Sequence, residues 1–264
     1  MRSLYISATG MKSQQINLDV ISNNLANVNT TGYKKGRADF EDLLYQSIRP
    51  VGASATANTV VPTGIYLGHG SRPVSTSKIF TQGAAKPTGE WSDVAVEGEG
   101  FFRVELPDGN IGYTRAGSFK IDANGILTTN NGNPLADNIA IPVDGIERDS
   151  IYVAADGTVN YKLAGVADAQ QAGQLQLAQF VNPAGLEAVG SNLFLESASS
   201  GPATVGIPGE NGLGTTLGGW LEASNVNIVD ELVDMIVGQR AYEINSKGIQ
   251  VSDEMLETAV NVKR

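Results

Sequence analysis

The sequence predicts an α+β protein, in which long terminal α-helices form a coiled-coil-like base and the residues between them form a mostly antiparallel β domain. Three observations predict this fold class. All ten prolines lie between Pro50 and Pro208, so both ends lack the residue that breaks helix interiors. Both ends repeat apolar residues at helical spacing. The middle is crowded with turn signals and short runs of β-branched and aromatic residues.

A first helix is expected over residues 3–28, where Ser3 can cap its start. Its stripe alternates spacings of four and three residues, which is typical of one helix face. The asparagine-rich run before Gly32 tolerates left-handed backbone and should end the helix. The apolar members of the stripe are Leu4, Met11, Leu18 and Leu25, and Ala8, Gln15 and Ser22 complete it.

The middle of the chain changes from helical to strand periodicity. Residues 46–72 hold Pro50, Pro62 and several glycines among small residues, so we expect an extended or loop-like segment. From 73 to 208 the apolar period is two, and hairpin signals such as Asn124-Gly125 and Asp156-Gly157 recur. This pattern indicates a mostly antiparallel β domain.

A second, longer helix is expected over residues 227–262. Asn227 is a suitable cap, and Asp230 and Glu231 fall in the first turn, where the helix dipole favours negative charge. A heptad seam follows this helix and includes the polar residues Gln239, Ser246 and Asp253. The apolar members of the seam are Ile228, Leu232, Met235, Tyr242, Ile249, Leu256 and Val260.

These elements divide the chain into three parts. Residues 1–30 and 225–264 form a paired terminal helical domain, 31–72 and 209–224 an extended connecting region, and 73–208 the central β domain. At 1.5 Å per residue, the second helix outruns the first by about 16 Å. Its seam also carries Gln and Ser at central positions, which would weaken a core formed by the two helices of one chain alone. The sequence therefore favours self-association with further copies of the chain.

Composition excludes several function classes. The chain has 28 acidic and 18 basic residues, a formal net charge of −10, so nucleic acid and anionic membranes are unsuitable partners. It has no cysteine and only one histidine, His69, which excludes thiolate chemistry and metal sites built from histidine. No apolar run approaches the roughly 18–20 residues that span a bilayer. We therefore expect no catalytic, cofactor-binding or metal-binding residues and no membrane insertion.

The sequence also allows an alternative function, that of a secreted β-domain binding module or hydrolase. Five acidic residues lie close in the sequence and could supply the carboxylate pair of a glycoside hydrolase or a carbohydrate-binding module. Carboxylates on solvated hairpins are much commoner than catalytic ones. The five residues are Asp93, Glu97, Glu99, Glu105 and Asp108.

Two long motifs at opposite ends carry a family resemblance. Residues 14–34 read QQINLDVISNNLANVNTTGYK, and 239–247 read QRAYEINSK after SNVN at 224–227. Both resemble the terminal signatures of bacterial flagellar rod and hook proteins, in the right order. The similarity continues through 96–102 and 113–119, so it covers essentially the whole chain. Within the family, residues 40–46 and 62–74 are similar to distal rod members, with proximal rod and hook paralogues as the nearest alternatives.

The resemblance implies a structural role without turnover. Subunits would be exported without a cleaved signal peptide and polymerise helically in the periplasmic space of the basal body, into a hollow drive shaft around the export channel. It implies contacts with other copies, proximal rod proteins, the hook or hook-junction proteins, the ring bushing and the export apparatus. The apolar members of both helical stripes are then the expected polymer interface.

For residues 46–72 the hypothesis is an axial bridge between neighbouring subunits that stiffens the rod. Its candidate residues are Tyr45, Pro50, Pro62, Tyr66 and Arg72.

Overall fold

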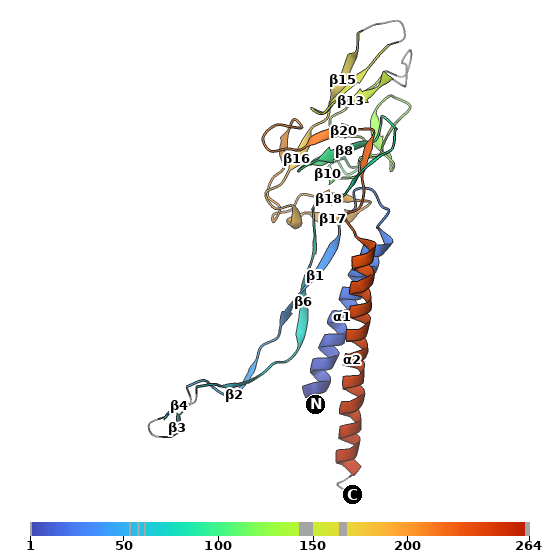
Figure 1. Ribbon diagram of the computed structural model, residues 1–264. Helices are drawn as coiled ribbons and strands as arrows, with labels where there is room; N and C mark the ends of the chain where they lie inside the picture. Colours follow the sequence, from blue (N-terminus) through green and yellow to red (C-terminus); the bar gives the residue numbers. More distant parts are fainter. Residues whose placement is uncertain are drawn as a thin grey trace. The chain divides into compact units, whose positions relative to one another are not determined.

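The predicted α+β class is confirmed by the computed structural model, which describes residues 2–52, 54–56, 59–60, 62–142, 150–163 and 168–261. Helix α1 (Arg2–Ala26) and helix α2 (Ile228–Asn261) lie at the two ends of the chain, with antiparallel β-structure between them (Figure 1). The chain forms two compact units. The first contains Met1–Ala26, Gly36–Ser77 and Asn227–Arg264, and the second contains Asn27–Lys35 and Lys78–Val226.

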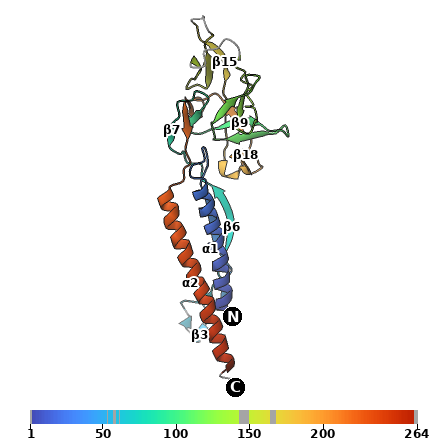
Figure 2. The ribbon, with the colours of Figure 1, turned by 90° about the vertical axis from the view of Figure 1, so that its right-hand side faces the viewer.

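In the first unit, α1 and α2 lie side by side in both views of the ribbon (Figures 1 and 2). Strand β1 (Gly36–Asp42) packs against α1 and pairs with β6 (Ser71–Lys78). Beyond this ladder, β2 (Gln46–Arg49) pairs antiparallel with β5 (Ile65–Leu67), and β3 (Ser54–Thr56) pairs with β4 (Thr59–Val60). The segment expected to be extended or loop-like is thus extended and largely paired with itself.

The second unit is built around a six-stranded antiparallel sheet in the order β17-β18-β10-β9-β16-β19. The other strands form β11-β12, β13-β14-β15, β20-β8 and β21-β7. The strands are β7 (Ala85–Pro87), β8 (Val94–Glu97), β9 (Phe101–Glu105), β10 (Ile111–Thr114), β11 (Phe119–Ile121), β12 (Leu127–Thr129), β13 (Tyr152–Val153), β14 (Thr158–Tyr161), β15 (Gln170–Gln174), β16 (Leu177–Gln179), β17 (Glu187–Gly190), β18 (Leu193–Leu195), β19 (Thr204–Gly206), β20 (Thr215–Gly218) and β21 (Trp220–Glu222). A 3₁₀ turn, η2, spans Pro183–Gly185.

The hydrophobic core lies in this second unit. Its larger cluster includes Phe102 and Phe119, which are fully buried and meet edge to face with ring centroids 5.1 Å apart. A smaller cluster gathers Phe101, Phe180 and Phe194 on the same sheet. Strands β20 and β21 lie in the stretch 209–224 that was expected to connect the domains, and they pair with β8 and β7 of this unit.

The predicted N-terminal cap is present on α2 but not on α1. Asn227 caps α2, because its Oδ1 accepts the backbone N–H of Val229 at 3.1 Å. Helix α1 already includes Arg2, so Ser3 lies inside the helix and the predicted cap is wrong. Its hydroxyl is instead used in a contact with α2, 3.1 Å from the hydroxyl of Ser252.

Candidate self-association interface

The two terminal helices pack along a line of small and polar residues. On α2 the line is Glu231, Gly238, Asn245 and Ser252, which are spaced by seven residues. At one end, Ser252 meets Ser3, and at the other the Nδ2 of Asn24 donates to Oε2 of Glu231 at 3.1 Å. Ser3 and Asn24 lie at opposite ends of α1, so the helices run antiparallel. Hydrogen bonds join the helices at the two ends of this line.

Glycine sets how closely the helices approach. A Cβ at Gly10 would lie 3.0 Å from the Nδ2 of Asn245, and one at Gly238 would lie 3.0 Å from the Cδ2 of Leu18. Such distances are shorter than ordinary van der Waals contact, so a side chain at either position would require Asn245 or Leu18 to shift by a few tenths of an ångström. These glycines, which weaken a helix in isolation, allow Asn245 and Leu18 to pack directly against the facing helix.

A buried polar cluster ties the start of β1 to both helices. Asn24 and Glu231 are essentially inaccessible to solvent. The Oδ1 of Asn24 accepts the backbone N–H of Gly36 at 2.8 Å, and its Nδ2 donates to the carbonyl of Gly36 at 2.9 Å. A single asparagine thus bonds both backbone groups of one residue and also the carboxylate of Glu231. This fixes the register of α1 against α2 at the end of the pair nearest the second helix's N-terminus.

The predicted stripes flank this line, and Leu18 lies against it at Gly238. Leu4, Met11, Leu18 and Leu25 are one position further along α1 than residues 3, 10, 17 and 24, and all four are half-buried. On α2, Met235, Ile249 and Leu256 are also half-buried, whereas Ile228, Leu232, Tyr242 and Val260 are exposed. Their role in a polymer interface stays a prediction. The seven-residue repeat of small and polar residues is the signal that marks the contact line itself.

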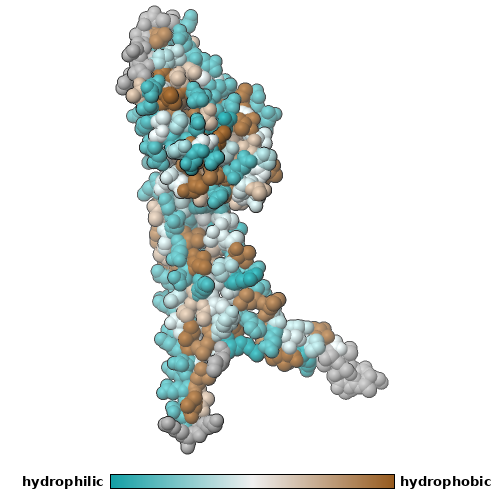
Figure 3. Space-filling view, turned by 180° about the vertical axis from the view of Figure 1, so that it is seen from behind, coloured by the Kyte–Doolittle hydropathy of each residue, from teal (hydrophilic) through white to brown (hydrophobic). Residues whose placement is uncertain are grey.

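A second apolar stripe on α2 was missed by the sequence reasoning. At 3.6 residues per turn, Val229, Val233 and Ile236 lie roughly opposite the line that faces α1, and the later members of the stripe lie about 60–100° to one side of that line. Its side chains are 52–69% exposed, and brown hydrophobic groups are visible along the surface of this unit (Figure 3). We call it the outer stripe of α2; its members are Val229, Val233, Ile236, Val237, Ile244, Val251 and Met255. An apolar face of this length on a surface helix is typical of a protein interface.

Inside the second unit, a buried ionic cluster holds the segment that follows α1. The Nζ of Lys34 lies 2.6 Å from Oε1 of Glu222, and Nη1 of Arg115 lies 3.5 Å from Oε2 of the same carboxylate. Lys34 also donates to the carbonyl of Thr81 at 2.8 Å. Burial lowers the pKa of Lys34, and the attraction of Glu222 opposes this shift. One carboxylate therefore holds two buried cations together.

The candidate stiffening residues lie at the paired segment and its base. Tyr45 precedes β2 and Tyr66 lies in β5; both are about half exposed, and Pro50 and Pro62 are exposed as well. Arg72 forms an ion pair with Glu41 across the β1–β6 ladder. A groove of about 810 Å³ beside these residues is lined by Tyr5, Glu41, Asp42, Leu43, Leu44, Tyr45, Gln46, His69 and Arg72. The structure thus brings Tyr45 and Arg72 to one groove, and leaves the two prolines outside it.

Two of the five acidic residues singled out in the sequence have contacts within the second unit. Asp93 is buried, and its backbone forms an isolated antiparallel bridge with Ser118. Glu99 accepts a hydrogen bond from Gln179 at 2.7 Å. Within the described ranges, no group of three or more His, Asp or Glu side chains is placed to hold a metal ion. Neither α1 nor α2, as far as the structure describes them, has the length and apolar character needed to cross a membrane.

Comparison with known proteins identifies the family. Three family models match this chain. The model of the "Flagella basal body rod protein" family matches residues 4–34. The "Flagellar hook protein FlgE/F/G D1 domain" model matches 95–161, and the "Flagellar basal body rod FlgEFG protein C-terminal" model matches 217–262. The flagellar basal-body rod protein FlgG of Borreliella burgdorferi is 51% identical to this chain over 264 residues, covering 100% of this chain and 99% of that protein. The chain belongs to the flagellar basal-body rod protein family.

Two further relatives are also flagellar rod or hook proteins. The flagellar basal-body rod protein FlgG of Bacillus subtilis is 42% identical over 274 aligned residues and covers both chains completely. The flagellar hook protein FlgE of Borreliella burgdorferi is only 25% identical over 446 aligned residues. The resemblance to flagellar rod proteins is therefore confirmed, and the chain is a structural component of the flagellar basal-body rod. Membership of this structural family, which is not enzymatic, makes the hydrolase alternative wrong.

Proposed function

We propose that this chain is the subunit of the distal part of the flagellar rod, which polymerises helically into a hollow drive shaft. The shaft transmits torque from the motor to the hook and encloses the export channel. The observation that carries the proposal is the outer stripe of α2, whose apolar side chains are exposed and lie off the line that contacts α1. The names of two relatives support the same assignment, because the proteins that are 51% and 42% identical to this chain are both flagellar basal-body rod proteins.

In this proposal, neighbouring copies cover the outer stripe and the predicted apolar stripes of both helices. Residues 1–30 and 225–264 form the inner tube, 31–72 and 209–224 connect it outward, and 73–208 form the outer β domain. The polar contacts between α1 and α2 support this arrangement, because exposed apolar side chains of α2 stay available for contacts between copies.

The proposed partners are the other components along the axis. They are further copies of the chain, the proximal rod proteins, the hook or hook-junction proteins, the ring bushing and the export apparatus. The proposed location is the part of the basal body in the periplasmic space, reached by export without a cleaved signal peptide. The acidic balance of 28 to 18 supports rotation inside a bushing with little non-specific adhesion.

Backbone hydrogen exchange on the chain, first dilute and then assembled, tests the proposal. In the dilute chain we expect protection in the β-strands from 94 to 195 and almost none in α1 and α2. In the polymer, both helices should become protected. Helices that are as protected in the dilute chain as the strands, together with no assembly at any concentration, would show a self-sufficient monomer and end the proposal.

We also propose that residues 46–72 bridge neighbouring subunits axially and stiffen the rod. Exposed apolar and aromatic residues support this, since Ile48 and Tyr66 in the segment are at least 49% exposed, as are Leu44 and Tyr45 directly before it. Gln46 and Leu67 face each other in the β2–β5 ladder, so residues 46–67 can be replaced by an Asn-Gly turn joining Tyr45 to Gly68. Polymers of this variant should bend more in electron micrographs. Equally straight polymers would contradict a stiffening role.

A further inference from the structure

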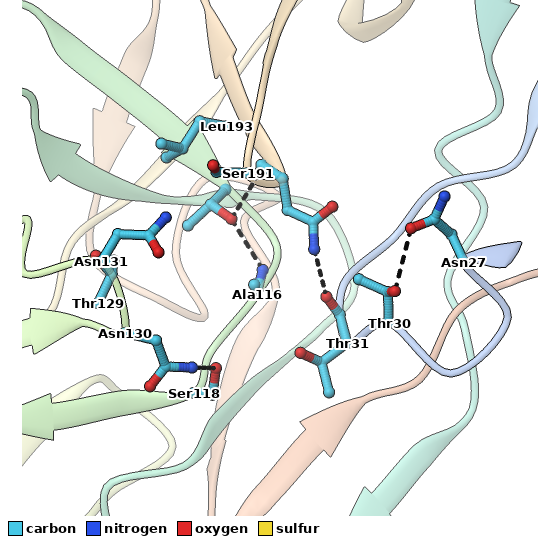
Figure 4. Close-up of a pocket in the computed structure, with 12 residues that line it drawn as sticks. Asn27, Thr30, Thr31, Ala116, Ser118, Thr129, Asn130, Asn131, Ser191 and Leu193 are labelled. Carbon is cyan, nitrogen blue, oxygen red and sulfur yellow. Dashed lines mark hydrogen bonds between the residues drawn. The ribbon is translucent and has the colours of Figure 1, made fainter. Parts of the chain in front are cut away.

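A polar cavity of about 410 Å³ lies within the second unit (Figure 4). Four segments form its wall: 27–31, 114–118, 129–131 and 191–193. The volume falls in the range of roughly 300–1,000 Å³ that is usual for ligand pockets. We call it the Asn/Thr pocket; it is lined by Asn27, Thr30, Thr31, Thr114, Ala116, Ser118, Thr129, Asn130, Asn131, Ser191, Asn192 and Leu193.

The wall of this pocket is polar but carries no charge. Ten of its twelve residues are Asn, Thr or Ser, and none is acidic, basic or aromatic. An ionic ligand would lose its hydration without gaining a counter-charge, and an apolar ligand would leave amide and hydroxyl groups unsatisfied. The pocket therefore suits an uncharged ligand that both donates and accepts hydrogen bonds.

Hydrogen bonds within the wall fix its shape. The Nδ2 of Asn192 donates to the carbonyl of Thr31 at 3.0 Å, and the hydroxyl of Thr114 donates to the carbonyl of Asn192 at 2.8 Å. On the other side, the Nδ2 of Asn130 donates to Oγ of Ser118 at 3.0 Å. These bonds join segments that are distant in sequence, so the pocket is formed before any ligand arrives.

Other groups in the wall are available to a ligand. Within the part of the chain that the structure describes, the side chains of Thr31, Asn131 and Ser191 form no hydrogen bond. Ser191 also has a left-handed backbone, with φ of 52°, next to Asn192 at 57°, in the two-residue turn between β17 and β18. Glycine or asparagine would suit such a position better than serine. The serine hydroxyl is thus presented to the pocket at a conformational cost.

We propose that the Asn/Thr pocket binds an uncharged stretch of backbone from a second copy of the chain. Asparagine carries one carbonyl and one N–H₂ group, so it matches the donors and acceptors of a peptide. A saccharide, by contrast, presents a face of C–H groups that aromatic rings cover, and the wall has no aromatic ring. This inference rests on the proposed function, because polymerisation brings the second copy within reach.

A chain without cysteine allows a direct test by single-site cross-linking. Asn131→Cys carries a maleimide-linked photo-cross-linker into the pocket, and Asn110→Cys places the same group on an exposed turn of the same unit. After illumination of the assembled polymer, Asn131→Cys should give a cross-linked dimer in high yield, and peptide mass spectrometry should identify an uncharged segment of the second copy. Asn110→Cys should give little dimer.

A charge substitution without cross-linker provides the second measurement. Asn131→Asp should raise the critical concentration for assembly by about tenfold, since a carboxylate in an uncharged pocket loses hydration without a partner. Asn110→Asp, which adds the same charge outside the pocket, should leave the critical concentration nearly unchanged.

The outcomes separate this inference from the proposed function. If both variants assemble normally and Asn131→Cys gives no dimer, the proposed function stands and the peptide site is wrong. If N-acetylglucosamine oligomers shift the NMR signals of residues 129–131 and 191–193 at millimolar concentration, the pocket is a saccharide site and the inference is again overturned. If the unmodified chain does not assemble at all, both fail together.

Discussion

At the residue scale, buried polar groups fix how α1, α2 and β1 are aligned with one another. Asn24 bonds both backbone groups of Gly36 and the carboxylate of Glu231, and it does so at a position where an apolar residue would pack more simply. Hydrogen bonds to charged groups contribute about 1.5–3 kcal/mol each, and a buried carboxylate that loses its donor is costly. Such a group specifies one alignment of the helices rather than adding to stability in general.

Asn24→Ala should therefore loosen α1 from α2 and from β1. We expect about 2–3 kcal/mol of lost stability in the helix pair, and Asn24→Asp should be at least as damaging because it places a second carboxylate beside Glu231. Hydrogen exchange of α1 and α2 in the assembled polymer measures this. The exposed Asn29→Asp is the control. Unchanged exchange in Asn24→Ala would refute a register role.

The carboxylate of Glu222 is the centre of the second unit's ionic cluster. Glu222→Gln leaves Lys34 and Arg115 buried without the carboxylate that they share, so we expect about 3–5 kcal/mol of lost stability. Both tryptophans, Trp91 and Trp220, lie in this unit, so tryptophan fluorescence in a urea titration reports its unfolding. The exposed Glu210→Gln should unfold as the unsubstituted chain does. Equal midpoints for all three proteins would show that the cluster contributes nothing.

A pH dependence follows from Asp137. Burial raises the pKa of its carboxyl above 3.8, against the opposing effects of the Gln176 N–H and Arg103. Between 3.8 and that raised value the native state binds more protons than the unfolded state, so native stability falls as pH rises through this window and is flat above it. Asp137→Asn should remove this slope. Urea titrations at successive pH values test it, and parallel profiles for both proteins would contradict the assignment.

At the element scale, the sequence predicted the elements better than their contacts. The absence of proline at both ends and the helical spacing of apolar residues placed α1 and α2 to within about two residues at each end. The same spacing did not find the contact line, because Ser3, Gly10, Asn24 and Glu231 carry no hydrophobic signal. The Asn/Thr pocket was equally hidden, since its wall joins four segments that only the fold brings together.

The outer stripe of α2 yields a prediction for the element as a whole. Ile236→Ser removes an apolar side chain from the centre of the stripe without touching the line that faces α1. Burial of such a side chain is worth about 1.5–3 kcal/mol, so the critical concentration for assembly should rise roughly tenfold to a hundredfold. Val205→Ser, at an exposed valine on β19, is the matched control. Sedimentation measures both, and equal critical concentrations would exclude the stripe from the interface.

At the scale of the whole molecule, assembly must overcome charge. Each copy carries a formal net charge of −10, so bringing copies together costs electrostatic repulsion that grows with every neighbour. The apolar stripe and the polar pocket supply attraction that salt affects little, whereas the repulsion weakens as the Debye length falls from about 30 Å at 0.01 M to about 8 Å at 0.15 M salt.

The critical concentration for assembly should therefore fall as salt rises from 0.01 M to 0.15 M, by several-fold or more. Ile236→Ser should show a higher critical concentration at every salt concentration but the same direction of change, because it removes apolar attraction and leaves charge unaltered. Sedimentation at fixed pH measures both series. A critical concentration that instead rises with salt would mean that ion pairs between copies hold the polymer together, and the outer stripe would then be a minor part of the interface.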